Sequence, residues 1–317
     1  MYTNTIAESN LDLLPISTKE GTEDGLFNDW WIPREKNHLI QLITDNALAT
    51  NTKSAYLSDI SQFEDAGSPE LSEYLLQLAL QGLKYSSIHR KAISISTKYN
   101  NLDDSVHSFL KGLKRTFLSN DASKVLPKKA TPVLKKDLIR IAKKLLKLET
   151  RKSLRDRTIL LVGWSAALRV SELANIKRKD LAKVPEGYIL TLTNSKNLRL
   201  GETSKRLLPY SSTHSISPAG VLDEYLETVE TEYLFPAYRR GDKELNQPIK
   251  KRALQNLLES LTGTSSHGLR RGVITTAFRM GCNPAGVMQI SGHRSISSLL
   301  EYNDADLFNA NGITTVL

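Results

Sequence analysis

Residues 158–173 read TILLVGWSAALRVSEL, an apolar run that stops at an arginine, with a glutamate three residues later. The spacing of the apolar residues up to Leu168 predicts a buried helix. An unpaired guanidinium at the end of such a helix is costly to desolvate, so Arg169 needs a partner, and Glu172 is the obvious candidate. Two interpretations are open: a structural ion pair, or a site in which Glu172 aims the Arg169 fork at an anion.

The stretches on both sides of this run predict a mainly α-helical chain with a small antiparallel β-sheet. After the run, Gly187–Thr193 (GYILTLT) and Lys205–Tyr210 (KRLLPY) have the composition of short strands joined by a polar hairpin. From Gly220 onward the pattern is mostly helical. Apolar residues at helical spacing predict further helices over residues 51–63, 72–83, 86–99, 135–148 and 154–168.

A polar segment with two prolines, Asn120–Pro132 (NDASKVLPKKATP), interrupts the helical pattern as a linker does. At 317 residues the chain has the length of about two domains. We therefore expect a disordered acidic tail over residues 1–25, a helical domain over 26–120, a linker over 121–133 and an α+β domain over 134–317 that ends in a tail helix.

The charge is unevenly distributed along the chain. The total is +9, from 43 Lys and Arg against 34 Asp and Glu. Residues 131–317 carry +11 and residues 81–130 carry +7, whereas residues 1–80 carry −9. Two basic surfaces, one in each half, predict a polyanionic partner.

Cysteine usage and hydropathy indicate a cytoplasmic protein. Cys282 is the single cysteine in the sequence, which excludes an intrachain disulfide and a cysteine-based zinc site. The N-terminus, MYTNTIAESNLDLL, has no basic segment followed by an apolar run, and the longest apolar stretch is too short to span a bilayer. We expect neither secretion nor membrane insertion.

Four short motifs in the second half carry the remaining informative polar groups. Each is weak alone: a His-x-x-Arg spacing is more often a surface pair, and a lone tyrosine more often packs than reacts. Together they offer cations, imidazoles and a phenol without a carboxylate pair or metal-ligand spacing, which suits neutralisation of a phosphodiester and attack on it by the phenol. The motifs are Asn194-Ser195-Lys196, His267-Gly268-Leu269-Arg270, Ser291-Gly292-His293-Arg294 and Tyr302.

In their order, these motifs and Arg-Val-Ser-Glu-Leu at 169–173 resemble the signature of the tyrosine recombinase (phage integrase) family. The resemblance spans residues 132–304, and the first domain is similar to the family's helical core-binding domain, a SAM-like DNA-binding fold. It implies an enzyme that cleaves and rejoins DNA without metal, ATP or another cofactor.

The resemblance also implies a role for each matching residue. Arg169 and Arg270 would grip the scissile phosphate, and Tyr302 would attack it to form a 3′-phosphotyrosyl link. His267 would move the tyrosine proton, and His293 would hydrogen-bond the phosphate.

A hairpin lysine would protonate the leaving 5′-oxygen. Lys196 is the expected residue, with Lys205 on the return strand as its competitor because the hairpin is longer than in many relatives. Glu172 would support Arg169 from behind.

Basic and polar helix starts predict the DNA contacts, although a solvated helical face is an equally good interpretation of each residue. The expected contacts are Thr52, Lys53, Tyr56, Lys84, Tyr85, Ser86, Ser87, His89, Arg90 and Lys91 in the first domain, and Lys177, Arg178, Lys179, Lys250, Lys251 and Arg252 in the second.

The resemblance further implies the partners. They are double-stranded DNA with short inverted-repeat sites and a homotetramer on that DNA, from a protein that is monomeric or weakly oligomeric when free. The tail 304–317 would dock on a neighbouring protomer, or serve as a packing helix alone. The resemblance also implies a cytoplasmic, nucleoid-associated protein of prokaryotic, phage or plasmid origin. Two alternatives remain open: a type IB topoisomerase, and a non-catalytic DNA-binding regulator on a recombinase scaffold.

Overall fold

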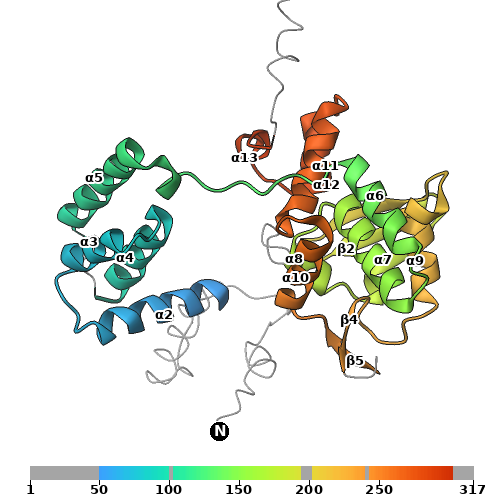
Figure 1. Cartoon of the computed structure of the whole chain (residues 1–317), viewed down its shortest axis with the longest axis horizontal. Helices are drawn as coiled ribbons and strands as arrows, with labels where there is room; N and C mark the ends of the chain where they lie inside the picture. Colours follow the sequence, from blue (N-terminus) through green and yellow to red (C-terminus); the bar gives the residue numbers. More distant parts are fainter. Residues whose placement is uncertain (1–49, 100–102, 194–201, 240–242, 303–317) are drawn as a thin grey trace, which may run out of the picture. The chain divides into compact units, whose positions relative to one another are not determined.

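The computed structural model describes residues 50–99, 103–193, 202–239 and 243–302 (Figure 1). The chain divides into two compact units, residues 1–127 and 128–317, and the division falls within the segment from which the sequence predicts a linker. Both units are mainly helical, and the strands form small antiparallel sheets, which confirms the predicted fold class.

The described part of the first unit is a set of helices around one apolar core. Its centre is formed by side chains such as Leu75, Ile88 and Ile95, which are fully buried. Carboxylates cap two helices, because Glu70 and Asp103 each accept a hydrogen bond from a backbone N–H in the first turn. The helices are α2 (Thr50–Asp65), α3 (Leu71–Leu80), α4 (Tyr85–Tyr99) and α5 (Asp104–Asn120), followed by a short 3₁₀ turn over Ala122–Lys124.

The second unit contains a longer set of helices and two sheets. Its helices are α6 (Lys135–Leu146), α7 (Arg151–Ser165), α8 (Val170–Ala174), α9 (Pro218–Leu226), α10 (Lys251–Thr262), α11 (His267–Arg279), α12 (Pro284–Ser291) and α13 (Ile296–Leu300). Its strands are β1 (Leu181–Val184), β2 (Gly187–Leu192), β3 (Ser204–Pro209), β4 (Pro236–Arg239) and β5 (Lys243–Pro248).

The predicted hairpin is present as β2 and β3, which pair antiparallel with Thr191 opposite Lys205 and Leu190 opposite Arg206. Strand β1 adds to the other side of β2, so the sheet order is β1-β2-β3. Strand β1 precedes the predicted hairpin and is not predicted from the sequence, and β4 and β5 lie in the segment after Gly220 that is predicted to be mostly helical. These strands are short and have little apolar alternation, as the exposed middle of β1 shows.

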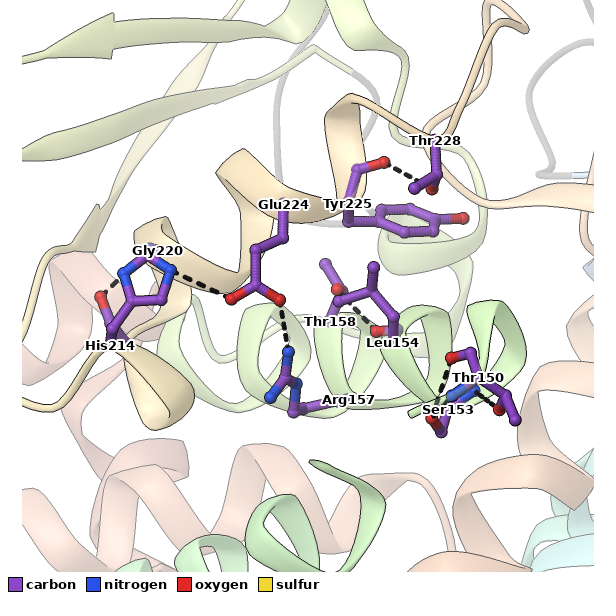
Figure 2. A network of polar contacts seen from close by, with 11 residues as sticks. Thr150, Ser153, Leu154, Arg157, Thr158, His214, Gly220, Glu224, Tyr225 and Thr228 are labelled. Atoms are coloured by element: carbon purple, nitrogen blue, oxygen red, sulfur yellow. Dashed lines mark hydrogen bonds and ion pairs between the residues drawn. The ribbon is translucent and has the colours of Figure 1, made fainter. Parts of the chain in front are cut away.

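Helix α7 is the centre of the second unit (Figure 1), and packs against α6, α9 and α11. Thr150 and Ser153 form a capping box at its start, and Ile159 to Val162 are buried almost completely. Figure 2 shows a polar link between α7 and α9: Arg157 donates to Glu224 at 2.6 Å, and His214 lies 3.0 Å from the other carboxylate oxygen.

The start of α11 is held against the segment that enters the unit. Val133 donates its N–H to the carbonyl of Gly268 at 2.9 Å, and its own carbonyl accepts from Trp164 Nε1 at 2.8 Å. Glycine is required at position 272, since a Cβ there would lie 1.8 Å from the Val133 carbonyl oxygen. This close approach fixes the helix that carries the His-x-x-Arg motif.

Within the described residues, no helix combines the length and the apolar character needed to cross a membrane.

Candidate active site

Arg169 stands at the N-cap of α8, where the predicted partnership with Glu172 is present. Glu172 accepts from Arg169 Nη1 at 2.7 Å through one carboxylate oxygen and from the Arg169 backbone N–H at 2.7 Å through the other. The Glu172 side chain is 4% exposed and the Arg169 side chain 23%. The carboxylate therefore fixes the arginine from the protein side, while part of the guanidinium faces solvent.

Arg270 lies on α11 and is 2% exposed. Its Nη1 donates to the carbonyl of Ala167 at 2.7 Å, and Ala167 has a left-handed backbone with φ of +51°. Desolvation, together with the charge of Arg169, lowers the pKa of Arg270 to about 10. Its Nη2 is buried and has no hydrogen-bond partner among the described residues, so the site holds a guanidinium nitrogen that an anion would satisfy.

His267 and Tyr302 meet although they are 35 residues apart. The Nε2 atom of His267 lies 2.9 Å from the hydroxyl oxygen of Tyr302. His267 keeps an exposed surface, but desolvation by the surrounding protein, followed by the charges of Arg270 and Arg169, lowers its pKa, which favours the neutral imidazole near pH 7. A neutral imidazole at hydrogen-bond distance is placed to accept the phenol proton.

His293 approaches the same tyrosine from another side, with ring centroids 5.1 Å apart. Helix α12 ends at Gly292 with φ of +64°, and this turn, rather than a continuing helix, carries His293 to the site. Its Nδ1 lies 2.7 Å from the hydroxyl of the buried Ser291. Desolvation first, and then Arg270 and Arg169, lower the pKa of His293 to about 4.

Tyr302 follows α13 across a turn, so the spacing of nine residues from His293 includes a break in the helix. Its backbone carbonyl accepts from Thr275 Oγ1 at 3.3 Å, and its ring packs on the small cluster around Ile274 and Leu299. The guanidinium of Arg271 lies 5.6 Å from the centre of the ring. These contacts fix the Tyr302 side chain beside His267 and His293.

The structure describes one of the two candidates for the hairpin lysine. Lys196 lies outside the described residues, and Lys205 is an exposed residue of β3. Its strand neighbour Arg206 faces the other way and is 7% exposed.

Sequence reasoning gave no role to four residues that contact the residues of this site: Ala167, Arg206, Arg271 and Ser291. A signal existed for Arg206, because strand alternation puts it on the same face as the apolar Leu208. No sequence signal indicates the left-handed backbone of Ala167, since alanine adopts it rarely.

Three of the predicted DNA contacts in the second unit line one groove. Lys177, Lys179 and Lys251, which starts α10, line it together with Glu172, the partner of Arg169. The groove has a volume of about 550 Å³. Lys177 also pairs with Glu232 at 2.8 Å. The other three predicted residues are exposed: Arg178, Lys250 and Arg252.

In the first unit, the predicted contacts differ in exposure. Lys91 is buried, and its amine lies 3.2 Å from Asp59 and donates to Gln62 at 2.7 Å. The prediction of Lys91 as a surface DNA contact is therefore wrong, because its charge is paired inside the unit. Arg90 also pairs with Asp59, at 3.1 Å, but its side chain stays 43% exposed. Lys84, Ser86 and His89 are exposed, and Thr52, Lys53, Tyr56, Tyr85 and Ser87 are half-buried.

Over the residues that the structure describes, no cluster of three or more His, Cys, Asp or Glu side chains is arranged to hold a metal ion.

The fold and the site agree with one family. Two arginines, two histidines and a tyrosine meet near the starts of α8 and α11 and just after the ends of α12 and α13. Residues 134–307 match the phage integrase family. The chain belongs to this family, and it is a tyrosine recombinase of the Xer and integrase type.

Relatives match over most of both chains. The chain is 25% identical over 301 residues to an integrase/recombinase XerD homologue of Selenomonas ruminantium, covering 85% of this chain and 86% of the relative. It is 24% identical over 279 residues to the tyrosine recombinase XerC of Staphylococcus aureus, covering 82% and 88%.

Solved structures share the fold. The Tn1549 transposon integrase in complex with circular intermediate DNA superimposes with a TM-score of 0.59 at 16% identity, covering 88% of this chain and 98% of that one. The XerH site-specific recombinase bound to its difH substrate gives 0.54 at 15% identity, covering 78% and 71%.

Proposed function

We propose that this protein cuts and rejoins specific DNA sites through a covalent bond between Tyr302 and the 3′-phosphate. The observation that carries the proposal is the 2.9 Å contact between the Tyr302 hydroxyl and His267 Nε2, beside the buried Arg270. A phenol in contact with a neutral imidazole and next to cations is an activated nucleophile.

The chemistry divides into two balanced steps. The Tyr302 oxygen attacks phosphorus while its proton passes to His267, and the bond to the 5′-oxygen breaks. The 5′-oxygen takes its proton from the hairpin lysine, Lys196 or Lys205. In the second step a 5′-hydroxyl attacks the phosphotyrosine while its proton returns to the lysine. The bond between phosphorus and the Tyr302 oxygen breaks, and His267 gives its proton back to that oxygen.

Arg169 and Arg270 supply the charge that such a transition state needs. The Nη2 of Arg270 is buried and without a partner in the described part of the site, and a phosphate oxygen would satisfy it. Because fixed guanidinium groups neutralise the phosphate and the ester bond preserves the energy of the broken strand, we propose that neither a divalent metal nor ATP is required.

His293 would donate to a non-bridging phosphate oxygen through Nε2. The Ser291 hydroxyl lies 2.6 Å from the Val287 carbonyl, to which it donates, and 2.7 Å from His293 Nδ1. For His293 to donate through Nε2, the single Ser291 proton has to turn from that carbonyl to Nδ1, which leaves the ring proton on Nε2. The low pKa of His293 means that this role is played by a neutral ring.

The proposed substrate is double-stranded DNA. In support, XerH is similar in fold and binds a difH substrate, and the Tn1549 transposon integrase is similar in fold and binds circular intermediate DNA. The groove lined by Lys177, Lys179, Lys251 and Glu172 would hold the DNA backbone through its lysines. Neutralising six to ten phosphates lowers the affinity by about 10³ to 10⁵ between 50 and 200 mM salt. We further propose short inverted-repeat sites, a homotetramer on DNA and exchange of strands through a Holliday junction.

A nicked suicide substrate tests the proposal. The binding site is first selected from a random DNA pool. A nick close to the cleavage position then lets the short fragment that carries the new 5′-hydroxyl diffuse away. Because this hydroxyl can no longer attack the phosphotyrosine, the covalent adduct accumulates. We expect an adduct with wild-type protein and none with Tyr302→Phe. An adduct that survives Tyr302→Phe contradicts the proposal, and relaxation of plasmids without recombinant products would instead support topoisomerase chemistry.

A further inference from the structure

Arg206 is a buried arginine where the strand pattern calls for an apolar side chain. On β3, Lys205 and Leu207 are exposed, while positions 206 and 208 face inward. Leu208 is fully buried, as expected, but position 206 holds a guanidinium that is 7% exposed. Burying a guanidinium costs free energy unless hydrogen bonds or an opposite charge compensate for the lost hydration.

The charges around Arg206 act on it in opposite directions, with Glu172 stabilising the guanidinium cation and Arg169 destabilising it. Desolvation lowers the pKa of Arg206, Glu172 raises it, and Arg169 lowers it again. Arg206 in turn contributes to the lowered pKa of Arg270. Three guanidinium groups thus share the carboxylate of Glu172, a balance that a bound phosphate would improve.

The guanidinium of Arg206 also contacts the turn that carries His293. A Cβ placed on Gly292 would lie 2.8 Å from Arg206 Nη2, so the arginine fits against the bare backbone of this glycine. Its Nη1 donates to Ser204 Oγ at 2.5 Å and to the Lys205 carbonyl at 3.0 Å. Its Nε is buried and has no partner among the described residues.

We propose that Arg206 is a positioning residue for strand cleavage: its charge completes the cationic site for the scissile phosphate, and its fork holds the Gly292 turn in place. The inference rests on the proposed function, because it names a further residue for the same phosphate. It ties the hairpin strand, which follows the candidate Lys196, to the turn before His293.

A second buried arginine in the same unit provides a matched control. Arg157 on α7 is 3% exposed and pairs with Glu224 at 2.6 Å, in the separate polar cluster of Figure 2. Replacing either arginine with glutamine removes one buried guanidinium. A purely structural role for Arg206 predicts similar behaviour of the two variants.

The first measurement needs no DNA. Thermal unfolding is followed in chloride and in 50 mM inorganic phosphate at equal ionic strength. We expect phosphate to raise the unfolding temperature of wild type and Arg157→Gln alike, and clearly less that of Arg206→Gln. In chloride, Arg206→Gln should lose less stability than Arg157→Gln, because it also removes a repulsion between like charges.

The second measurement is single-turnover adduct formation on the nicked substrate at saturating DNA. We expect Arg206→Gln to slow it about 10- to 100-fold while the Kd for DNA changes less than about threefold. Arg206→Lys should recover part of the rate, since it restores the charge but not the planar fork. Arg157→Gln should form adduct at the wild-type rate per folded molecule.

The outcomes separate this inference from the proposed function. If wild type forms no adduct, the proposed function fails, and the phosphate comparison still decides on Arg206. Wild-type phosphate stabilisation in Arg206→Gln, or an unchanged adduct rate, overturns the inference.

Discussion

Glu172 is the residue whose removal tests the charge balance of the site most simply. The perturbation is Glu172→Ala. It deletes two contacts of 2.7 Å, one from the Arg169 guanidinium and one from its backbone N–H. It also leaves Arg169, Arg206 and Arg270 without the carboxylate that acts on all three.

The magnitude follows from these contacts. A hydrogen bond to a charged group contributes about 1.5–3 kcal/mol, and breaking a buried ion pair costs about 3–5 kcal/mol. Because the Arg169 side chain is 23% exposed, water recovers part of this loss. We expect the free energy of unfolding of the second unit to fall by about 2–4 kcal/mol.

Urea unfolding followed by circular dichroism measures this value. Glu227→Ala, which removes an exposed glutamate at the end of α9, is the control and should change stability by less than about 0.5 kcal/mol. Glu172→Gln keeps the acceptor for the backbone N–H and should lose less than Glu172→Ala. A loss below about 1 kcal/mol for Glu172→Ala would refute the view that this carboxylate holds the arginine cluster together.

Three further predictions concern stability. Gly272→Ala should lower the free energy of unfolding in urea by about 2–3 kcal/mol or more, because its Cβ would lie 1.8 Å from the Val133 carbonyl oxygen. Gly286→Ala has open space around its Cβ and should be neutral or stabilising. Equal effects of the two substitutions would contradict this packing. Glu149→Gly should raise the free energy of unfolding by about 0.5–1 kcal/mol, since the exposed Glu149 has φ of +47°, and a loss would argue against strain there. The pKa of His293 is about 4 in the folded state and near 6.5 in the unfolded chain, so the unfolded chain takes up a proton first as the pH drops. The free energy of unfolding should therefore fall between pH 6.5 and pH 4, and it should fall less in His293→Gln. An identical fall in both proteins would contradict the lowered pKa.

Sequence reasoning found the parts of the fold that have a clear apolar period. The β2–β3 hairpin and α7 follow from alternation and from a long apolar run, respectively. The β4–β5 hairpin has no such period, although its pairing is local in sequence and begins with Arg239 opposite Lys243. Its residues therefore gave no local signal.

The sequence predicted which residues form the site but not how their side chains lie relative to one another. The order of the motifs identified Arg169, His267 and Tyr302, and the sequence proposed the Glu172 pair from spacing alone. What it could not provide is the approach of His267 to Tyr302, which depends on the packing of α11 and α13. It also could not tell a surface lysine from a buried one, as Lys91 shows.

The identity of the attacking residue is the central claim, and mass spectrometry of the covalent adduct tests it most directly. Residues 295–317 contain no lysine or arginine, so trypsin releases Tyr302 on the peptide that follows Arg294, where it is the single tyrosine. We predict that this peptide carries the DNA strand through a 3′-phosphate on Tyr302, with a free 5′-hydroxyl on the other strand end. DNA attached to any other peptide, or through a 5′-phosphate, would contradict the account.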